Sequence, residues 1–300
     1  MRIKRIGTLL LTLALIGTAL AGFAANAVAE GNYGLDEFIM VLIPGEDTEK
    51  SVQLRDNMAE AMSEAIGIPV TIYRATDYSA AVEAMRTGKA QLAGFGPFSY
   101  VVARERSGAE CLVVTGTNGQ MGYYSYIITR ADSGIETLAD LKGKSFSFVD
   151  PESTSGNVIP TDSIINALPE LNLTFDDLHT DGVFFSTAMF AGTHPSSIQA
   201  VIQGNVDAGA VSSGTYANQL EKGNFKDGDL KILFQSALIP GSPIAIQKDL
   251  PQELKDKVRD FLLSYDDDEY FGSPDKRYIA VSDSDYDYLA ELKDKYGLSD

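Results

Sequence analysis

Three consecutive hydroxyl residues, Ser153, Thr154 and Ser155, stand where a predicted strand at 145–149 leads into a predicted helix at 159–168. The first N–H groups of a helix have no partner within the helix, and the helix dipole adds partial positive charge there. Hydroxyls and free amides at such a point can bind an anion, and they suit phosphate-like oxygens. The alternative is an ordinary helix N-cap, because Ser and Thr are favoured caps in any helix.

The first 29 residues have the pattern of a secretory signal peptide. Three basic residues occur within the first five positions, an apolar run covers 6–21, and Ala27-Val28-Ala29 matches a small-x-small cleavage site. A retained membrane anchor is the alternative, but the apolar run is short for a membrane span. The only cysteine, Cys111, lies far from the cleavage site and leaves no internal disulfide. We expect a periplasmic protein that is cleaved near Ala29 and is not a lipoprotein.

The chain is strongly acidic, with a formal charge of −18, or −21 without the three basic residues of 1–29. Such a protein repels nucleic acid and anionic membrane surfaces. Oriented local donors in a shielded cleft would have to attract a bound anion, because the long-range field opposes it. The acidic stretches 266–269 and 283–287 lack the glycine and the ligand spacing of a calcium loop. With two histidines and one cysteine in the chain, we expect neither a metal nor a cofactor.

Predicted strands and helices alternate along two α/β units. In the first unit, the pattern indicates a parallel sheet flanked by helices; strands are expected at 38–43, 69–73, 91–95 and 112–115, and helices at 48–66, 79–86 and 97–106. In the second unit, the strand at 145–149 and its helix are followed by a helix at 196–202 and strands at 206–211 and 230–234. Amphipathic helices are expected at 250–264 and 286–296.

The second unit is inserted into the first, since the chain leaves through 124–129 and returns through 235–244. We predict a two-lobe α/β fold in which these two strand crossings form the hinge. Lobe 1 would comprise 30–124 and 241–300, and lobe 2 would comprise 125–240. Ligands of open α/β sheets bind at the carboxyl ends of the strands, and in a two-lobe protein those ends face the cleft.

An ordered set of short motifs resembles the phosphonate/phosphite class of substrate-binding proteins of ABC transporters. The matching stretches are Asp77-Tyr78, Phe95-Gly96-Pro97-Phe98-Ser99-Tyr100, Gly122-Tyr123-Tyr124-Ser125, 138–144, 150–156 with Pro160, Gly192-Thr193-His194, 204–208 and Leu238-Ile239-Pro240. They span about 38–265. The resemblance implies a periplasmic-binding-protein fold of the type II clamshell kind.

The resemblance also implies which residues contact the ligand. The family binds its oxyanion between the lobes, and its motifs correspond to Tyr78 and Tyr123 in lobe 1 and to Ser153, Thr154, Ser155 and His194 in lobe 2; we add Ser242. Tyrosine hydroxyls are neutral, rigid donors, and a histidine can donate whether neutral or charged. In this interpretation no lysine or arginine is needed.

Structural roles remain the alternative for several of these residues. The two tyrosines could shield the surface, and His194 could be a structural loop residue. The other histidine, His179, is interpreted as a solvated loop residue. Ser99 and Tyr100 could either approach the cleft or simply begin a helix.

One departure from the family pattern bears on the ligand. Family members that bind aminoalkyl phosphonates place carboxylates near the amine, and the corresponding positions here fall near Gly214 and at Ser242. Neither residue can pair with an ammonium group. We therefore expect a small phosphorus oxyanion without an amine, with phosphite or methylphosphonate favoured and phosphate also considered.

The resemblance implies a soluble, monomeric receptor that closes on its ligand and docks on an ABC permease. A sensor that presents the same ligand to a signalling receptor is the alternative. Ser155, His194 and Asp207 are the residue types of a hydrolase triad. The chain has no Gly-x-Ser-x-Gly elbow and no His/Cys cluster for zinc, so we do not expect an enzyme.

Overall fold

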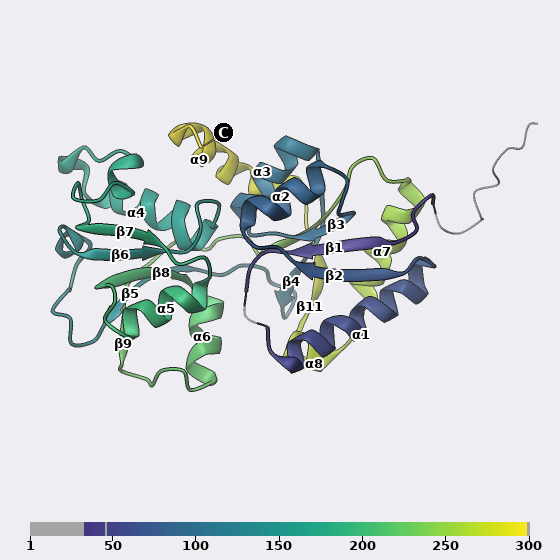
Figure 1. The fold of residues 1–300 in the computed structure, drawn as a ribbon, viewed down its shortest axis with the longest axis horizontal. Coiled ribbons are helices and arrows are strands. Elements are labelled where there is room, and N and C mark those ends of the chain that lie inside the picture. Colours follow the sequence, from purple (N-terminus) through teal and green to yellow (C-terminus); the bar gives the residue numbers. More distant parts are fainter. Residues whose placement is uncertain (1–32, 46, 299–300) are drawn as a thin grey trace, which may run out of the picture.

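The computed structural model describes residues 33–45 and 47–298, which form two lobes, each built on one sheet with helices packed against it (Figure 1). The predicted signal peptide and its cleavage site near Ala29 lie outside these residues. Within the described part of the chain, no helix is long and apolar enough to cross a membrane.

The sheet of lobe 1 has six strands in the order β11-β4-β10-β3-β1-β2. They are β1 (Phe38–Leu42), β2 (Val70–Arg74), β3 (Leu92–Gly94), β4 (Glu110–Thr117), β10 (Pro243–Ile246) and β11 (Lys276–Ala280). The four predicted strands β1 to β4 run in the same direction, but the complete sheet is mixed. β1 is parallel to β2 and β3, but β10 runs antiparallel between β3 and β4, and β11 runs antiparallel to β4. The reason is that β10 carries the chain back from lobe 2 and enters the sheet in the opposite direction.

Helices cover both faces of this sheet (Figure 1). They are α1 (Glu49–Ile66), α2 (Tyr78–Arg86), α3 (Pro97–Ser107), α7 (Gln252–Ser264), α8 (Asp268–Phe271) and α9 (Asp287–Tyr296). Met58 and Met62 are one helical turn apart on α1 and are both buried in one core cluster with Val258 and Leu262 of α7. Val82 and Val101, from α2 and α3, belong to the other cluster.

The sheet of lobe 2 has five strands in the order β7-β6-β8-β5-β9. They are β5 (Ser125–Arg130), β6 (Ser145–Phe148), β7 (Thr187–Phe190), β8 (Ala208–Ser212) and β9 (Leu230–Gln235), and the helices are α4 (Ile159–Ala167), α5 (His194–Ile202) and α6 (Ser213–Glu221). β6 is parallel to β7 and β8, whereas β5 is antiparallel to β8 and β9. This sheet too is mixed, because β5 brings the chain in from lobe 1.

The two crossings that the sequence predicted between the lobes lie side by side. Tyr123 N–H donates to the Ile239 carbonyl at 3.0 Å, and Ile239 N–H donates to the Tyr123 carbonyl at 2.8 Å. Next to them, Ser125 N–H donates to Ser236 Oγ at 2.9 Å, and Ser236 N–H donates to the Ser125 carbonyl at 3.0 Å. The lobes are therefore joined by a short, hydrogen-bonded double connection.

Candidate functional site

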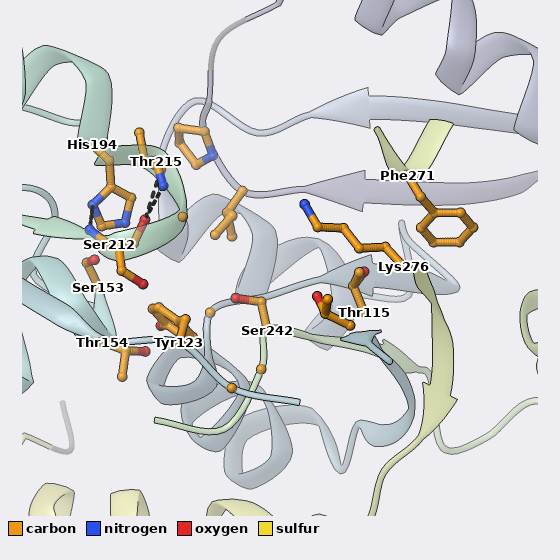
Figure 2. A pocket seen from close by; sticks show the side chains of 18 of the residues that line it. Thr115, Tyr123, Ser153, Thr154, His194, Ser212, Thr215, Ser242, Phe271 and Lys276 are labelled. Atoms are coloured by element: carbon orange, nitrogen blue, oxygen red, sulfur yellow. Dashed lines mark hydrogen bonds between the residues drawn. The ribbon is translucent and has the colours of Figure 1, made fainter. Parts of the chain in front are cut away.

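A cavity of about 690 Å³ lies between the lobes (Figure 2). Seven residues were predicted from the sequence to contact the ligand, and six of them line this cavity: Tyr78, Tyr123, Ser153, Thr154, His194 and Ser242. The seventh, Ser155, is buried, and its side chain hydrogen-bonds with the Tyr123 phenol. The fold thus brings together residues that are up to 164 positions apart.

The Ser-Thr-Ser turn follows β6 and continues as a π-helical turn, Thr154–Val158, that leads into α4. Ser153 caps this turn, since its Oγ accepts a hydrogen bond from Gly156 N–H at 3.1 Å. A Cβ on Gly156 would lie only 2.4 Å from the Val149 side chain, so glycine is required for the turn to pack against the preceding strand end. The sequence left open whether these hydroxyls form a helix N-cap or an anion site. Ser153 does form the cap, and the same turn also lines the cavity.

Thr154 connects the turn to the other lobe. Its Oγ1 accepts a hydrogen bond of 2.8 Å from Phe98 N–H, at the N-terminus of α3. The oxygen therefore serves as an acceptor for the protein, and the same hydroxyl group also hydrogen-bonds with the Tyr123 phenol.

The two tyrosines are neutral donors in the cavity wall. Burial raises the pKa of Tyr78 well above its ordinary value, against the opposing effect of a hydrogen bond from Ser153. Burial also raises the pKa of Tyr123 to about 12, although hydrogen bonds with Ser155, Thr154 and Ser242 act in the opposite direction. Both phenols therefore keep their hydrogen at neutral pH, and both contact the Ser-Thr-Ser turn.

His194 is the first residue of α5, after the N-cap Thr193, rather than a loop residue. Its Nδ1 accepts a hydrogen bond of 3.2 Å from Ser212 N–H. Burial lowers the pKa of the ring to about 4. With Nδ1 occupied as an acceptor and the ring neutral, the hydrogen lies on Nε2, which can donate to a ligand.

The N-terminus of α6 is a second group of hydroxyls that sequence reasoning missed. Ser212, Ser213, Gly214 and Thr215 all line the cavity. Ser212 Oγ accepts from Thr215 N–H at 3.2 Å and donates to Thr215 Oγ1 at 2.8 Å. The signal was present, because Ser-Ser-Gly-Thr follows the strand at 206–211 just as Ser-Thr-Ser follows the strand at 145–149.

A third group, on the sheet of lobe 1, was also missed. Thr115 and Thr117 of β4 line the cavity together with Lys276 and Tyr278 of β11. The sequence interpretation required no lysine or arginine, yet Lys276 reaches the cavity (Figure 2). None of the described residues that line the cavity has a carboxylate.

His179 is not a solvated residue, so that interpretation is wrong. Its ring stacks on Phe175 and packs at a tilt against Phe148, with ring centroids 4.7 and 4.5 Å apart. Its Nε2 lies 2.6 Å from Asn157 Oδ1 within the π-helical turn. Burial lowers the pKa of His179. The residue braces the Ser-Thr-Ser turn from behind, a role that only the packing of distant aromatic residues reveals.

Three other residues considered from the sequence lie away from the cavity. Ser99 Oγ donates to the Gly96 carbonyl at 3.1 Å, and the Tyr100 hydroxyl bonds to the Asp283 carboxylate. Asp207 lies just before β8, and its carboxylate accepts a hydrogen bond of 2.8 Å from Ser145 N–H. This is the end of β8 that lies away from the cavity. Ser155, His194 and Asp207 therefore do not form a triad. Within the described residues, no group of three or more His, Cys, Asp or Glu is placed to hold a metal.

The family model of the periplasmic substrate-binding proteins of phosphonate ABC transporters matches residues 40–293. The chain belongs to this family. It is therefore the transport component that binds a small ligand in the periplasm for an ABC permease, and it is not an enzyme.

Individual relatives agree with this assignment. The phosphate-import protein PhnD of Mycolicibacterium smegmatis is 31% identical over 315 residues, which cover 98% of this chain and 96% of that protein. The binding protein of a phosphonate ABC transporter from Pseudomonas aeruginosa has a TM-score of 0.76 at 23% identity and covers 88% of this chain and 87% of its own. PhnD1 from Prochlorococcus marinus, solved with methylphosphonate, has a TM-score of 0.73 at 20% identity, with coverage of 87% and 98%. At these identities the two structures show that the two-lobe fold is shared.

Proposed function

We propose that the cleft binds a small phosphorus oxyanion that carries no amino group, with methylphosphonate or phosphite preferred, and that the lobes close on it by bending at the two crossings. The observation that carries the proposal is the set of neutral hydrogen-bond donors that converge on one cavity from both lobes. In this proposal the protein is a monomer, its signal peptide is removed near Ala29, and the lobes divide at 124/125 and 240/241.

Two donors are oriented by the protein itself. Thr215 and the His194 ring each use an acceptor atom within the fold, which leaves one hydrogen free toward the ligand. Such preset donors lose little entropy on binding, because their geometry is fixed before the ligand arrives. Together with Ser153, Tyr78 and Tyr123 they would surround the phosphorus-bound oxygens.

The electrostatics of the cavity support a ligand without an amine. A buried ammonium group needs a carboxylate or several acceptors, and none of the described lining residues has a carboxylate. The basic group that does line the cavity, Lys276, would repel an ammonium. By the motif resemblance, the positions where the family's amine-binding members have a carboxylate fall near Gly214 and at Ser242, and neither residue provides a negative charge.

The relatives support the same class of ligand. PhnD1 of P. marinus is solved with methylphosphonate, and the M. smegmatis protein is described as a phosphate importer. Phosphate is therefore the principal competitor for methylphosphonate and phosphite in any test.

Calorimetric titration of residues 30–300 with methylphosphonate, phosphite, phosphate, 2-aminoethylphosphonate and sulfate tests the proposal. We expect one-to-one binding that is tightest for methylphosphonate or phosphite. Ser153→Ala and His194→Ala should each weaken it roughly tenfold or more, as expected for a hydrogen bond to a charged group. Ser264→Ala, at an exposed site of α7, is the matched control.

Two results would overturn different parts of the proposal. If no phosphorus oxyanion binds, the assignment of the ligand class to this cavity is wrong. If 2-aminoethylphosphonate binds most tightly, the exclusion of amines is wrong while the cavity assignment stands.

A further inference from the structure

The pairing of β4 with β11 places a second polar group on the cavity wall. Lys276 lies opposite Thr117, and Tyr278 lies opposite Thr115. Because side chains alternate along a strand, residues two apart share a face, and directly paired residues share it too. All four of these side chains line the cavity, so one face of this strand pair forms its lobe 1 wall.

Among residues 33–45 and 47–298, Lys276 has no ion-pair partner that would explain its position. Its neighbour Arg277, on the other face of β11, contacts the carboxylates of Asp266 and Asp268. No carboxylate of the described residues forms an ion pair with Lys276. In a chain of formal charge −18, this ammonium group enters a cavity in which no described lining residue has a carboxylate, and that exception suggests a ligand.

The threonines beside it are also available. Within the described residues, the hydroxyls of Thr115 and Thr117 form no hydrogen bond, whereas the Tyr278 hydroxyl is occupied by the Tyr270 hydroxyl at 2.8 Å. Lys276, Thr115 and Thr117 therefore present one positive charge and two hydroxyls. These groups match a carboxylate or a second phosphorus oxyanion.

The cavity has room for a ligand that reaches both groups. Figure 2 shows Lys276 and Thr115 on one side of Ser242, and His194, Ser153 and Thr154 on the other, with the ammonium pointing away from Phe271 toward that second group. A volume of about 690 Å³ falls within the range of roughly 300–1,000 Å³ that encloses drug-sized ligands. A phosphite ion alone would leave the Lys276 side of such a cavity to water.

We propose that Lys276, Thr115 and Thr117 form a second anion-binding subsite, so that phosphonates that carry a further anionic group, such as a carboxylate, bind more tightly than methylphosphonate or phosphite, which are preferred among ligands with a single anionic group. This inference rests on the proposed function, because the phosphonate group itself occupies the hydroxyl-rich side near Ser153 and His194. It adds to that function the kind of substituent that Lys276, Thr115 and Thr117 would select.

The test compares ligands that differ only in the second group. Phosphonoacetate, 3-phosphonopropionate and 4-phosphonobutyrate carry a carboxylate at increasing distance from the phosphorus atom. In 2-oxopropylphosphonate a neutral acetyl group replaces the carboxylate of phosphonoacetate with nearly the same shape. We expect at least one phosphonocarboxylate to bind the wild-type protein roughly tenfold or more tightly than methylphosphonate, and 2-oxopropylphosphonate to show no such gain.

Lys276→Met should remove that gain, lowering phosphonocarboxylate affinity roughly ten times more than methylphosphonate affinity. Lys276→Arg should retain the preference, and Lys257→Met, an exposed change of equal charge on α7, should leave it intact. Thr117→Val is a second, independent variant, which should weaken the carboxylate preference without altering net charge.

The outcomes separate this inference from the proposed function. Equal losses for methylphosphonate and phosphonocarboxylates in Lys276→Met would place the lysine on the phosphonate group and overturn the second subsite. So would a wild-type protein that binds methylphosphonate but gains nothing from any carboxylate. Failure of every phosphorus oxyanion to bind would overturn the proposed function first.

Discussion

His194 is kept neutral by its surroundings. Burial lowers its pKa to about 4, and the Ser212 amide occupies Nδ1. A neutral imidazole is a directional donor whose charge does not depend on pH near neutrality. It therefore suits a receptor that must bind an oxyanion without holding a permanent cation next to it.

Replacing His194 by glutamine should change how stability depends on pH. The unfolded ring takes up a proton near its ordinary pKa of 6.5, whereas the folded ring does so only near pH 4. As the pH falls from about 6.5 to 4, the free energy of unfolding of the wild type should therefore decrease relative to His194→Gln, and the difference should level off below that range. Urea unfolding at pH 7, 5.5 and 4 measures this, and an unchanged difference would show that the ring is not buried in its neutral form.

Gly214 offers a second test at the level of a single residue. A Cβ at this position meets no atom within 4 Å, so a side chain can enter the cavity without displacing its walls. Gly214→Asp should weaken methylphosphonate binding roughly tenfold or more through charge repulsion and should improve the relative affinity for 2-aminoethylphosphonate. Gly214→Asn is the neutral control, and an equal loss in both variants would indicate a steric effect instead.

At the level of elements, the site is built by repeating one unit, a strand followed by hydroxyl residues at the start of a helical segment. β6 leads into Ser153 and Thr154, and β8 leads into Ser212 and Thr215. Because β6 and β8 are adjacent and parallel, their carboxyl ends open at the same edge of the sheet. The N-terminus of α5, with His194, is the third contribution from lobe 2.

The start of α2 contacts the other lobe through a carboxylate. Ser79 Oγ donates to Glu152 Oε1 at 3.0 Å, while the buried Glu152 Oε2 has no hydrogen-bond partner among the described residues. Burial raises the pKa of Glu152, and the hydrogen bond from Ser79 only partly opposes that effect. The charge of this side chain at neutral pH is therefore a cost to the folded state.

Glu152→Gln should stabilise the protein at pH 7 by about 0.5–1 kcal/mol, since it removes a partly desolvated charge. The gain should shrink as the pH falls through the raised pKa of Glu152, because the wild-type carboxyl group then becomes neutral as well. Thermal unfolding at pH 7 and pH 4 tests this, with Glu170→Gln as an exposed control. A loss of stability at pH 7 would show that the negative charge is favourable at this contact.

At the level of the whole molecule, α9 links the two lobes on top of the hinge (Figure 1). The Tyr286 ring, just before α9, packs on Tyr100 of α3 with centroids 5.0 Å apart. At the other end, Lys295 Nζ and the Tyr296 hydroxyl lie 2.7 and 2.6 Å from Asp162 Oδ1 in lobe 2. The lobes are thus connected by a helix as well as by the two crossings.

The charge of the whole molecule predicts an unusual salt effect. Residues 30–300 carry a formal charge of −21, which is the −18 of the full chain without the three basic residues of 1–29. This charge repels an approaching oxyanion, and added salt screens that repulsion beyond roughly 8 Å at physiological ionic strength. The association rate of methylphosphonate should therefore rise between low salt and about 0.5 M NaCl. Stopped-flow tyrosine fluorescence can follow it, since the chain has 14 tyrosines and no tryptophan. A rate that falls with salt would mean that local positive groups dominate the approach.

The sequence by itself determined most secondary-structure elements, the two-lobe organisation and one part of the candidate site. Local patterns of apolar residues predicted most strands and helices, and the order of those elements predicted two lobes with two crossings. The hydroxyls at 153–155 were found because a strand end, three small polar residues and a helix start are adjacent in the chain. Such features need only short-range information.

Only the tertiary structure decided what depends on contacts between distant segments. β10 and β11 both pair with β4, which lies more than 100 positions earlier in the chain. Local sequence patterns do not encode the direction of β10 or the pairing of β11. Lys276 enters the cavity because of that pairing, and His179 becomes a brace because three phenylalanines close around it. Both outcomes follow from side-chain packing and strand register, which are fixed only when the whole chain is folded.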